Sequence, residues 1–129
     1  LIGRVMSARA GKVAEGKPMR PVIVKIAPDI AEEDIGPMTE RLAAHAVDGI
    51  AVSNTTLSRH GLSDTRKDEA GGLSGRPVFH RATVMLAKVH QATGGKIPII
   101  GIGGIDSADT ALAKIEAGAS LLQLYTGLI

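Results

Sequence analysis

The chain has 129 residues, a formal net charge of +2, 44% hydrophobic residues and only 2% aromatic residues. Its basic residues are scattered among acidic ones, and no apolar run reaches the roughly 20 residues of a membrane span, so neither a nucleic-acid-binding stripe nor a membrane helix is predicted. The sequence contains no cysteine, which excludes a disulfide framework, a thiolate metal site and a cysteine nucleophile.

The two ends of the chain look interrupted. The first residues read as the middle of a helix and the last as the end of a strand, so we expect residues 1–129 to be one unit that is incomplete at both ends. Because aromatic residues are so few, any core must consist of Ile, Leu, Val and Ala. That composition is typical of a buried parallel sheet covered by helices.

The first predicted strand and helix lie within residues 21–47. A β-branched run at 21–26 predicts a strand buried on both faces, interrupted only by Lys25. After a turn, apolar residues at helical spacing predict a helix over about 32–47. Pro37 must lie in the early part of this helix or divide it.

The second strand is predicted at 50–52, and it runs directly into the polar residues 53–56. Residues 57–77 show little periodicity and predict a long loop, which in a compact domain is usually functional or disordered. Apolar residues at helical spacing then predict a helix over 78–93.

A third strand is predicted at 97–102 and a fourth at 120–124. Ser107 is the expected N-cap of the helix between them, and Gly118 its expected end. The expected buried face of this helix consists of Ala108, Ala111, Leu112 and Ile115.

The order of the elements predicts an α/β fold. Strands that alternate with helices require parallel pairing through crossover connections. Four such units correspond to half of an eight-stranded (β/α)8 barrel. In that fold the active site lies at the C-terminal ends of the strands, where the unusual polar residues of this sequence fall.

Two glycine-containing or polar segments predict a phosphate site. Gly103 and Gly104 follow the third strand, where glycines let backbone amides approach a phosphate. Tyr125 and Thr126 follow the fourth strand and offer further N–H and hydroxyl donors. Each segment has an ordinary alternative, a tight turn for the glycines and a packed rim residue for the tyrosine.

Polar residues on the first two strands predict a ligand site beside it. Lys25 interrupts an apolar strand, which calls for an anionic partner unless the side chain reaches solvent at the strand end. Asn54 can read a planar ring that presents an amide or carboxylate edge, with Ser53 and Thr55 beside it. The alternative is that these polar residues form an Asx or hydroxyl turn.

The long loop ends in Gly71–Gly75, which is either a flexible tip or a close backbone approach to a bound molecule. The charged run 64–69 predicts a solvated loop tip. The four histidines show no ligand spacing, so no metal site is predicted.

Five segments together resemble the quinone-dependent (class 2) dihydroorotate dehydrogenase family. The match runs over nearly the whole chain, and the five segments occur in the order and approximate spacing of that family. They are Val24-Lys25-Ile26-Ala27-Pro28-Asp29, Val52-Ser53-Asn54-Thr55-Thr56, Gly71-Gly72-Leu73-Ser74-Gly75-Arg76-Pro77, Ile100-Gly101-Ile102-Gly103-Gly104-Ile105 and Gln123-Leu124-Tyr125-Thr126.

The resemblance implies the C-terminal half of an FMN-binding barrel that oxidises dihydroorotate to orotate and passes the electrons to a quinone. By position, Lys25 resembles the lysine beside the flavin ring, and Asn54 and Thr55 resemble the orotate-binding pair. Ser53 stands where the family usually has a flavin-contacting threonine. The remaining cofactor-binding residues implied by position are Ser74, Gly75, Gly103, Gly104, Tyr125 and Thr126.

The resemblance also implies that important parts lie outside these residues. The family's catalytic base is a serine on an upstream loop, so no catalytic residue is expected in this chain, which should be inactive alone. The helices that form the quinone tunnel and hold the parent protein peripherally at the cytoplasmic membrane are likewise expected elsewhere. The open sheet edges of a half barrel predict self-association, domain swapping or disorder. Two alternatives stay open: another phosphate-binding barrel enzyme, and a non-enzymatic half-barrel binding module.

Overall fold

The computed structural model describes residues 1–129 and contains a single parallel sheet. Its four strands are hydrogen-bonded in the order β1-β2-β3-β4, and each neighbouring pair is parallel. The predicted α/β order with parallel strands is therefore confirmed. The strands are β1 (Ile23–Ile26), β2 (Gly49–Val52), β3 (Ile99–Ile102) and β4 (Leu121–Gln123).

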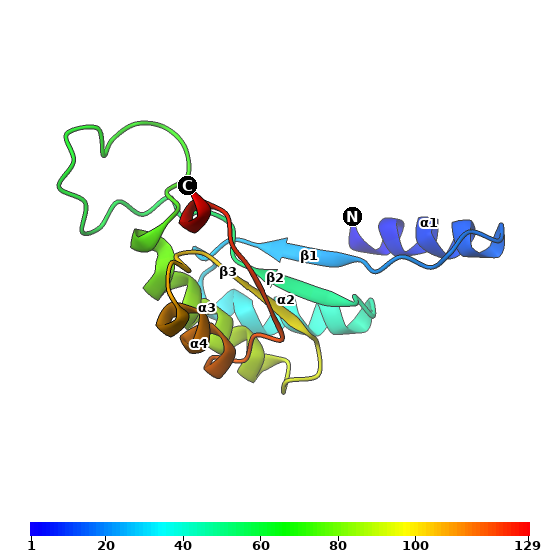
Figure 1. Ribbon diagram of the computed structural model, residues 1–129. Helices are drawn as coiled ribbons and strands as arrows, with labels where there is room; N and C mark the ends of the chain where they lie inside the picture. The colour runs from blue at the N-terminus through cyan, green and yellow to red at the C-terminus, as the bar shows by residue number, and fades with distance from the viewer.

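The helices that connect successive strands cover one face of the sheet (Figure 1). They are α2 (Glu32–Ala44), α3 (Phe79–Ala92) and α4 (Ala108–Glu116), while α1 (Ile2–Ala14) precedes β1, and short 3-10 turns occur at Arg76–Val78 and Thr126–Leu128. Helix α1 lies near the N-terminal ends of the strands. The C terminus and the long loop after β2 lie at the opposite end, to which the strand arrows point (Figure 1).

The core lies between the sheet and the helices α2 and α3. Ile50 and Ile99 of the two central strands are completely buried, as are Leu86 and Val89 of α3. These side chains belong to one hydrophobic cluster, which also includes residues of α2 such as Leu42. No helix has both the length and the apolar character required to cross a membrane.

The prediction that the first strand is buried on both faces is wrong. In β1, Ile23 and Lys25 are exposed and only Ile26 is fully buried. The physical reason is that β1 is an edge strand, and the helices cover only one face of the sheet. The β-branched run identified the strand correctly, because such residues suit pleated backbone at an edge as well as in the centre.

Helix α4 begins as predicted but buries a different face. Ser107 is its N-cap and forms a capping box with Thr110, so this prediction is confirmed. Leu112 and Ile115, however, are each 52% exposed. The only fully buried side chain of the helix is Lys114, because the helix is rotated so that this position faces the sheet.

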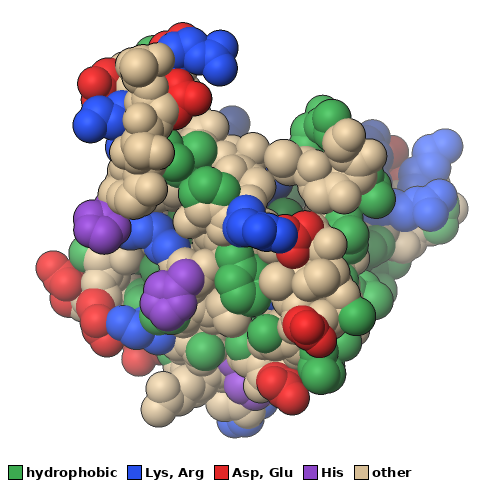
Figure 2. Space-filling view, turned by 60° about the vertical axis from the view of Figure 1, so that its left-hand side comes forward, with side chains coloured by type: hydrophobic (Ala, Val, Ile, Leu, Met, Phe, Trp, Pro, Cys, Tyr) green, Lys and Arg blue, Asp and Glu red, His purple; other side chains and the backbone are tan.

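Two further sequence features have clear outcomes. Pro37 lies in the first half of a continuous α2, past its first turn, so it does not divide the helix although one backbone hydrogen bond is missing there. The long loop from 57 to 75 contains no helix or strand, as predicted, and an isolated bridge between Thr56 and Leu73 closes its base. The charged tip at 64–69 is fully exposed and projects from the body of the molecule (Figure 2).

Candidate functional site

The residues that the sequence predicted as a site surround one cavity of about 210 Å³ at the C-terminal ends of the strands. They come from all four strand ends and from the end of the long loop. The predicted residues that line the cavity are Lys25, Ser53, Asn54, Thr55, Ser74, Gly75, Gly103, Gly104, Tyr125 and Thr126. The expectation that these segments converge is therefore confirmed.

The turn after β3 brings backbone amides to the cavity wall. Gly103 and Gly104 have φ values of +100° and +71°, which L side chains rarely adopt. A Cβ at Gly104 would also lie 2.7 Å from the Cα of Phe79, at the start of α3. No hydrogen bond outside the helices and strands uses the amides of Gly103, Gly104 or Tyr125, so these donors are available to a ligand.

The end of the long loop contacts the segment that follows β4. The hydroxyl oxygens of Ser74 and Thr126 are 3.1 Å apart. Gly75 has a φ of +72°, and a Cβ there would lie 3.3 Å from the Thr126 Cγ2. The Tyr125 side chain is 77% exposed. Hydroxyls and backbone amides from two distant segments thus lie side by side at one edge of the cavity.

The ends of β1 and β2 supply the opposite part of the wall. Lys25 pairs in register with Ala51 and forms no ion pair within the chain. Its exposure matches the alternative of a lysine that reaches solvent. Ser53 is buried, and its hydroxyl donates to the carbonyl of Asn54 at 2.8 Å.

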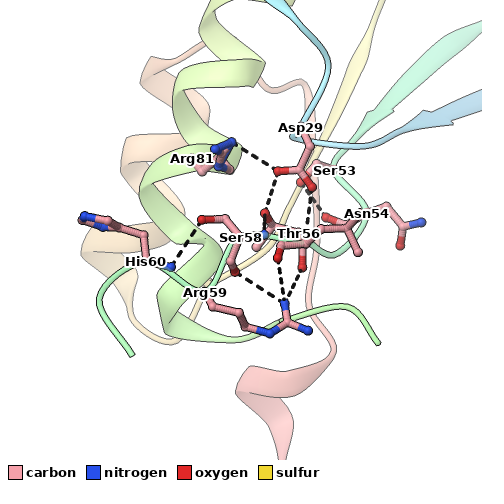
Figure 3. Close-up of polar contacts among 9 residues, drawn as sticks. Asp29, Ser53, Asn54, Thr56, Ser58, Arg59, His60 and Arg81 are labelled. Atoms are coloured by element: carbon pink, nitrogen blue, oxygen red, sulfur yellow. Dashed lines mark hydrogen bonds and ion pairs between the residues drawn. The ribbon is translucent and has the colours of Figure 1, made fainter. Parts of the chain in front are cut away.

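Asn54 and Thr56 differ in what they contact. The exposed Asn54 side chain forms no hydrogen bond within the chain, which argues against an Asx turn, and it points away from the polar contacts around Thr56 (Figure 3). The Thr56 hydroxyl accepts a hydrogen bond from the amide of Ser58 at 3.0 Å, so the hydroxyl-turn interpretation holds for this residue. Asn54 therefore keeps both its donor and its acceptor for a ligand.

Sequence reasoning missed a polar network behind Asn54 and Thr55. The Asp29 carboxylate accepts hydrogen bonds from the Thr56 hydroxyl at 2.6 Å and the Leu57 amide at 2.8 Å. Arg81 of α3 lies 3.2 Å from the same carboxylate (Figure 3). The sequence showed Asp29 only as a turn residue after a proline. Its position after β1, beside the polar end of β2, was the available signal.

Sequence reasoning also missed Lys114, which lies beneath the glycine turn. This fully buried side chain donates from its Nζ to the Ile102 carbonyl at 3.3 Å. The ammonium lies 5.2 Å from the centre of the Phe79 ring. Loss of solvation lowers the pKa of Lys114 to about 8. Lys114 lies three residues from both Ala111 and Ala117, on a helix face of small residues, and this spacing was the available sign that its side chain is buried.

An ion pair borders the cavity between the long loop and the turn after β3. The Arg76 Nε lies 2.8 Å from the Asp106 carboxylate. This hydrogen bond holds the pKa of Asp106 below its usual value. Because both side chains are close to solvent, the ion pair contributes little to the free energy of unfolding and mainly holds the end of the long loop beside the turn after β3.

A parallel sheet with helices connecting its strands and a cavity at the C-terminal ends of those strands is the arrangement of the (β/α)8-barrel class of enzymes. The family model for dihydroorotate dehydrogenase matches residues 4–129, and the chain belongs to this family. Sequence and structure relatives support this assignment independently.

Two curated relatives are dihydroorotate dehydrogenases (quinone). The protein from Rhizobium rhizogenes is 52% identical over 130 residues, which cover 100% of this chain and 36% of the relative. The protein from Brucella anthropi is 52% identical over 132 residues, with the same shares covered. The chain thus spans about a third of the length of the curated relatives it matches.

The solved structures of DHODH from Eimeria tenella have the same fold. The complex with ferulenol superimposes with a TM-score of 0.82 at 36% identity, covering 88% of this chain and 30% of the other. The ligand-free form gives a TM-score of 0.81 at 38% identity, covering 84% of this chain and 31% of the other. Four parallel strands with their helices therefore correspond to part of a barrel enzyme.

Proposed function

We propose that the chain forms part of a quinone-dependent dihydroorotate dehydrogenase, which oxidises dihydroorotate to orotate in pyrimidine biosynthesis. The observation that carries this proposal is the single cavity lined by all the residues that resemble the cofactor and substrate sites of the family. The names of the curated relatives support the same activity.

The cofactor in this proposal is FMN, which when bound would supply the redox chemistry between dihydroorotate and a quinone. The donor set fits its phosphate, because the amides of Gly103, Gly104 and Tyr125 are free and the Thr126 hydroxyl lies beside them. Lys25 lies at the cavity wall, where its ammonium would favour negative charge on the ring of a bound flavin. Ser53, Ser74 and Gly75 complete the proposed cofactor contacts.

Asn54 and Thr55 are the proposed substrate-binding pair. The unpaired Asn54 amide can donate to a carboxylate or carbonyl oxygen and accept from a ring N–H. The cavity volume of about 210 Å³ is below the roughly 300–1,000 Å³ typical of ligand pockets. We therefore propose that other parts of the parent protein complete the enclosure of the flavin and the substrate.

None of the serines in this chain is proposed as the catalytic base. The Ser74 hydroxyl contacts Thr126, and Ser58 and Ser63 do not line the cavity. We propose that the base, the quinone tunnel and the peripheral contact with the cytoplasmic membrane belong to parts of the parent protein outside these residues. The 129-residue chain alone should then bind no substrate productively and show no dihydroorotate oxidation.

The proposal is tested on the full-length protein that contains these residues. We expect purified protein to carry FMN and to oxidise dihydroorotate with a quinone as acceptor. Replacing Lys25 with Ala should slow flavin reduction by about 100-fold, the scale of losing one electrostatic contact in an active site. The matched control is Lys96→Ala, at an exposed position outside the cavity.

Two results would contradict the proposal. The first is a protein that binds a sugar phosphate but no flavin, which would indicate a different phosphate-binding barrel enzyme. The second is a flavin-free protein without any catalytic activity, which would indicate a binding module. A normal rate of flavin reduction in Lys25→Ala would remove the role given to the lysine.

A further inference from the structure

One arginine side chain holds together the two limbs of the long loop. On the first limb, the Arg59 Nη1 donates to the carbonyls of Thr56 at 3.3 Å and Leu57 at 3.2 Å. On the second limb, Nε donates to the Lys67 carbonyl at 2.9 Å, and Nη2 donates to the carbonyls of Glu69 at 3.1 Å and Gly71 at 2.6 Å. Figure 3 shows the guanidinium directed at the carbonyls of the first limb.

The guanidinium of Arg59 is well suited to holding several carbonyl groups at fixed positions. Arg59 forms no ion pair within the chain, so its partners are carbonyl dipoles and not carboxylates. A guanidinium presents five N–H donors in a rigid plane, whereas an ammonium has three donors around one atom. Apart from the bridge between Thr56 and Leu73, no secondary structure joins the two limbs.

The limbs that Arg59 joins lead directly into the proposed site. Thr55 comes directly before the first limb, which begins at Thr56. Gly72 comes directly after Gly71, whose carbonyl Arg59 binds on the second limb. Gly72 lies so close to Thr55 that a Cβ at position 72 would be 2.5 Å from the Thr55 Cβ. Two residues further on, the Ser74 hydroxyl lies 3.1 Å from that of Thr126. A shift of the second limb therefore displaces both a proposed substrate contact and a proposed flavin contact.

We propose that Arg59 is a positioning residue for the substrate site: it fixes the Gly71-Gly72 backbone against Thr55 without touching the substrate or the cofactor. This inference rests on the proposed function for its catalytic consequence. Its structural part, the joining of the two loop limbs, stands independently. Arg59 does not line the cavity, and the phosphate turn at Gly103-Gly104 does not depend on its contacts.

The test compares Arg59→Ala, Arg59→Lys and Arg66→Ala in the full-length, flavin-loaded protein. Arg66 lies in the same loop, but its side chain is 76% exposed and pairs at 3.6 Å with Asp64, two residues away, so it does not join the limbs. We expect Arg59→Ala to raise the KM for dihydroorotate and lower kcat/KM by about 10- to 100-fold, the scale of a small misplacement of reacting groups. FMN content should change less than kcat/KM, because Arg59 contacts none of the proposed phosphate-binding residues Gly103, Gly104 and Tyr125.

Two further measurements separate positioning from general destabilisation. Arg59→Lys should fail to restore kcat/KM, because retaining the charge does not restore the planar set of donors. Cleavage by a glutamyl endopeptidase at the exposed Glu69 should become faster in both Arg59 variants and stay unchanged in Arg66→Ala. Equal kinetics and equal cleavage in Arg59→Ala and wild type would overturn the inference. A flavin-free wild type would instead refute the proposed function and leave the cleavage test valid.

Discussion

Thr55 occupies the space in which a side chain at position 72 would lie. A Cβ at Gly72 would be 2.5 Å from the Thr55 Cβ, closer than real Cβ contacts occur, although the backbone at Gly72 does not require positive φ. We therefore expect Gly72→Ala to move Thr55 and to raise the KM for dihydroorotate by about tenfold in the full-length protein, as misplaced binding groups do. Steady-state kinetics check this result.

The control for this substitution is Gly11→Ala. Gly11 lies in α1, and a Cβ there would meet no atom within 4 Å beyond its chain neighbours. Alanine should stabilise the protein by about 0.5–1 kcal/mol through its higher helix propensity, with unchanged kinetics. If Gly72→Ala also left the KM unchanged, Thr55 would not be a substrate contact.

The buried ammonium of Lys114 should make stability depend on pH. Its pKa is about 8 in the folded protein against 10.5 as the ordinary value, because burial removes solvent from the charge. Between these pH values the unfolded chain binds more protons than the folded one, so the free energy of unfolding should rise with pH, by at most about 3 kcal/mol. Below pH 8 this contribution is constant and unfavourable.

Lys114→Met isolates this effect, since methionine has a similar length and no charge. Urea unfolding of wild type and variant at several pH values between 7 and 10.5 measures the difference in stability. We expect the variant to be the more stable protein at pH 7 and to lose that advantage as the pH rises. A difference that does not change with pH would show that the ammonium is solvated in the folded state.

At the scale of elements, α3 contributes more residues to the hydrophobic core than any other helix, because it packs against both central strands. Leu86 is completely buried, so Leu86→Ala should reduce the free energy of unfolding by about 2–5 kcal/mol through lost burial and a residual cavity. Val84 lies on the same helix but is 40% exposed, and Val84→Ala should cost less than about 1 kcal/mol. Denaturant unfolding checks both values, and equal losses would contradict this packing.

The strands were predictable from sequence because short β-branched runs bounded by glycine, proline and polar residues rarely form any other secondary structure. The location of the candidate site was predictable for another reason: parallel strands bring their C-terminal ends to one edge of the sheet. The burial of β1 was misjudged because the local pattern does not distinguish an edge strand from a central one. The buried face of α4 was misjudged because Leu112 and Ile115 look like core residues while Lys114 does not.

The contacts around the long loop could not be predicted from sequence. Arg59 reaches carbonyls up to 12 residues away, and a backbone carbonyl carries no signature in the residue type. Asp29 and Thr56 are 27 residues apart and come from different strand ends. Such pairings depend on how the loop closes on itself and on its base at the strand ends, which the periodicity of the sequence does not encode.

At the scale of the whole molecule, the sheet has two open edges. β1 pairs only with β2, and β4 pairs only with β3. An edge strand presents unpaired N–H and C=O groups that can pair with another chain. Both edges also carry exposed apolar side chains, Ile23 at 45% and Leu121 at 63% exposure. The 129-residue chain on its own therefore combines two conditions for association, free backbone groups and apolar side chains beside them.

We expect the isolated 129-residue chain to self-associate through these edges. Sedimentation should show a mean mass that increases with protein concentration. Leu121→Lys places a charge on the β4 edge and should shift the distribution toward the monomer, because lysine on an edge strand opposes pairing. Leu62→Lys is the control, since Leu62 lies in the long loop, away from both edges. A wild-type chain that sediments as a monomer at all concentrations would contradict this expectation, because neither open edge would then be sufficient to recruit a second chain.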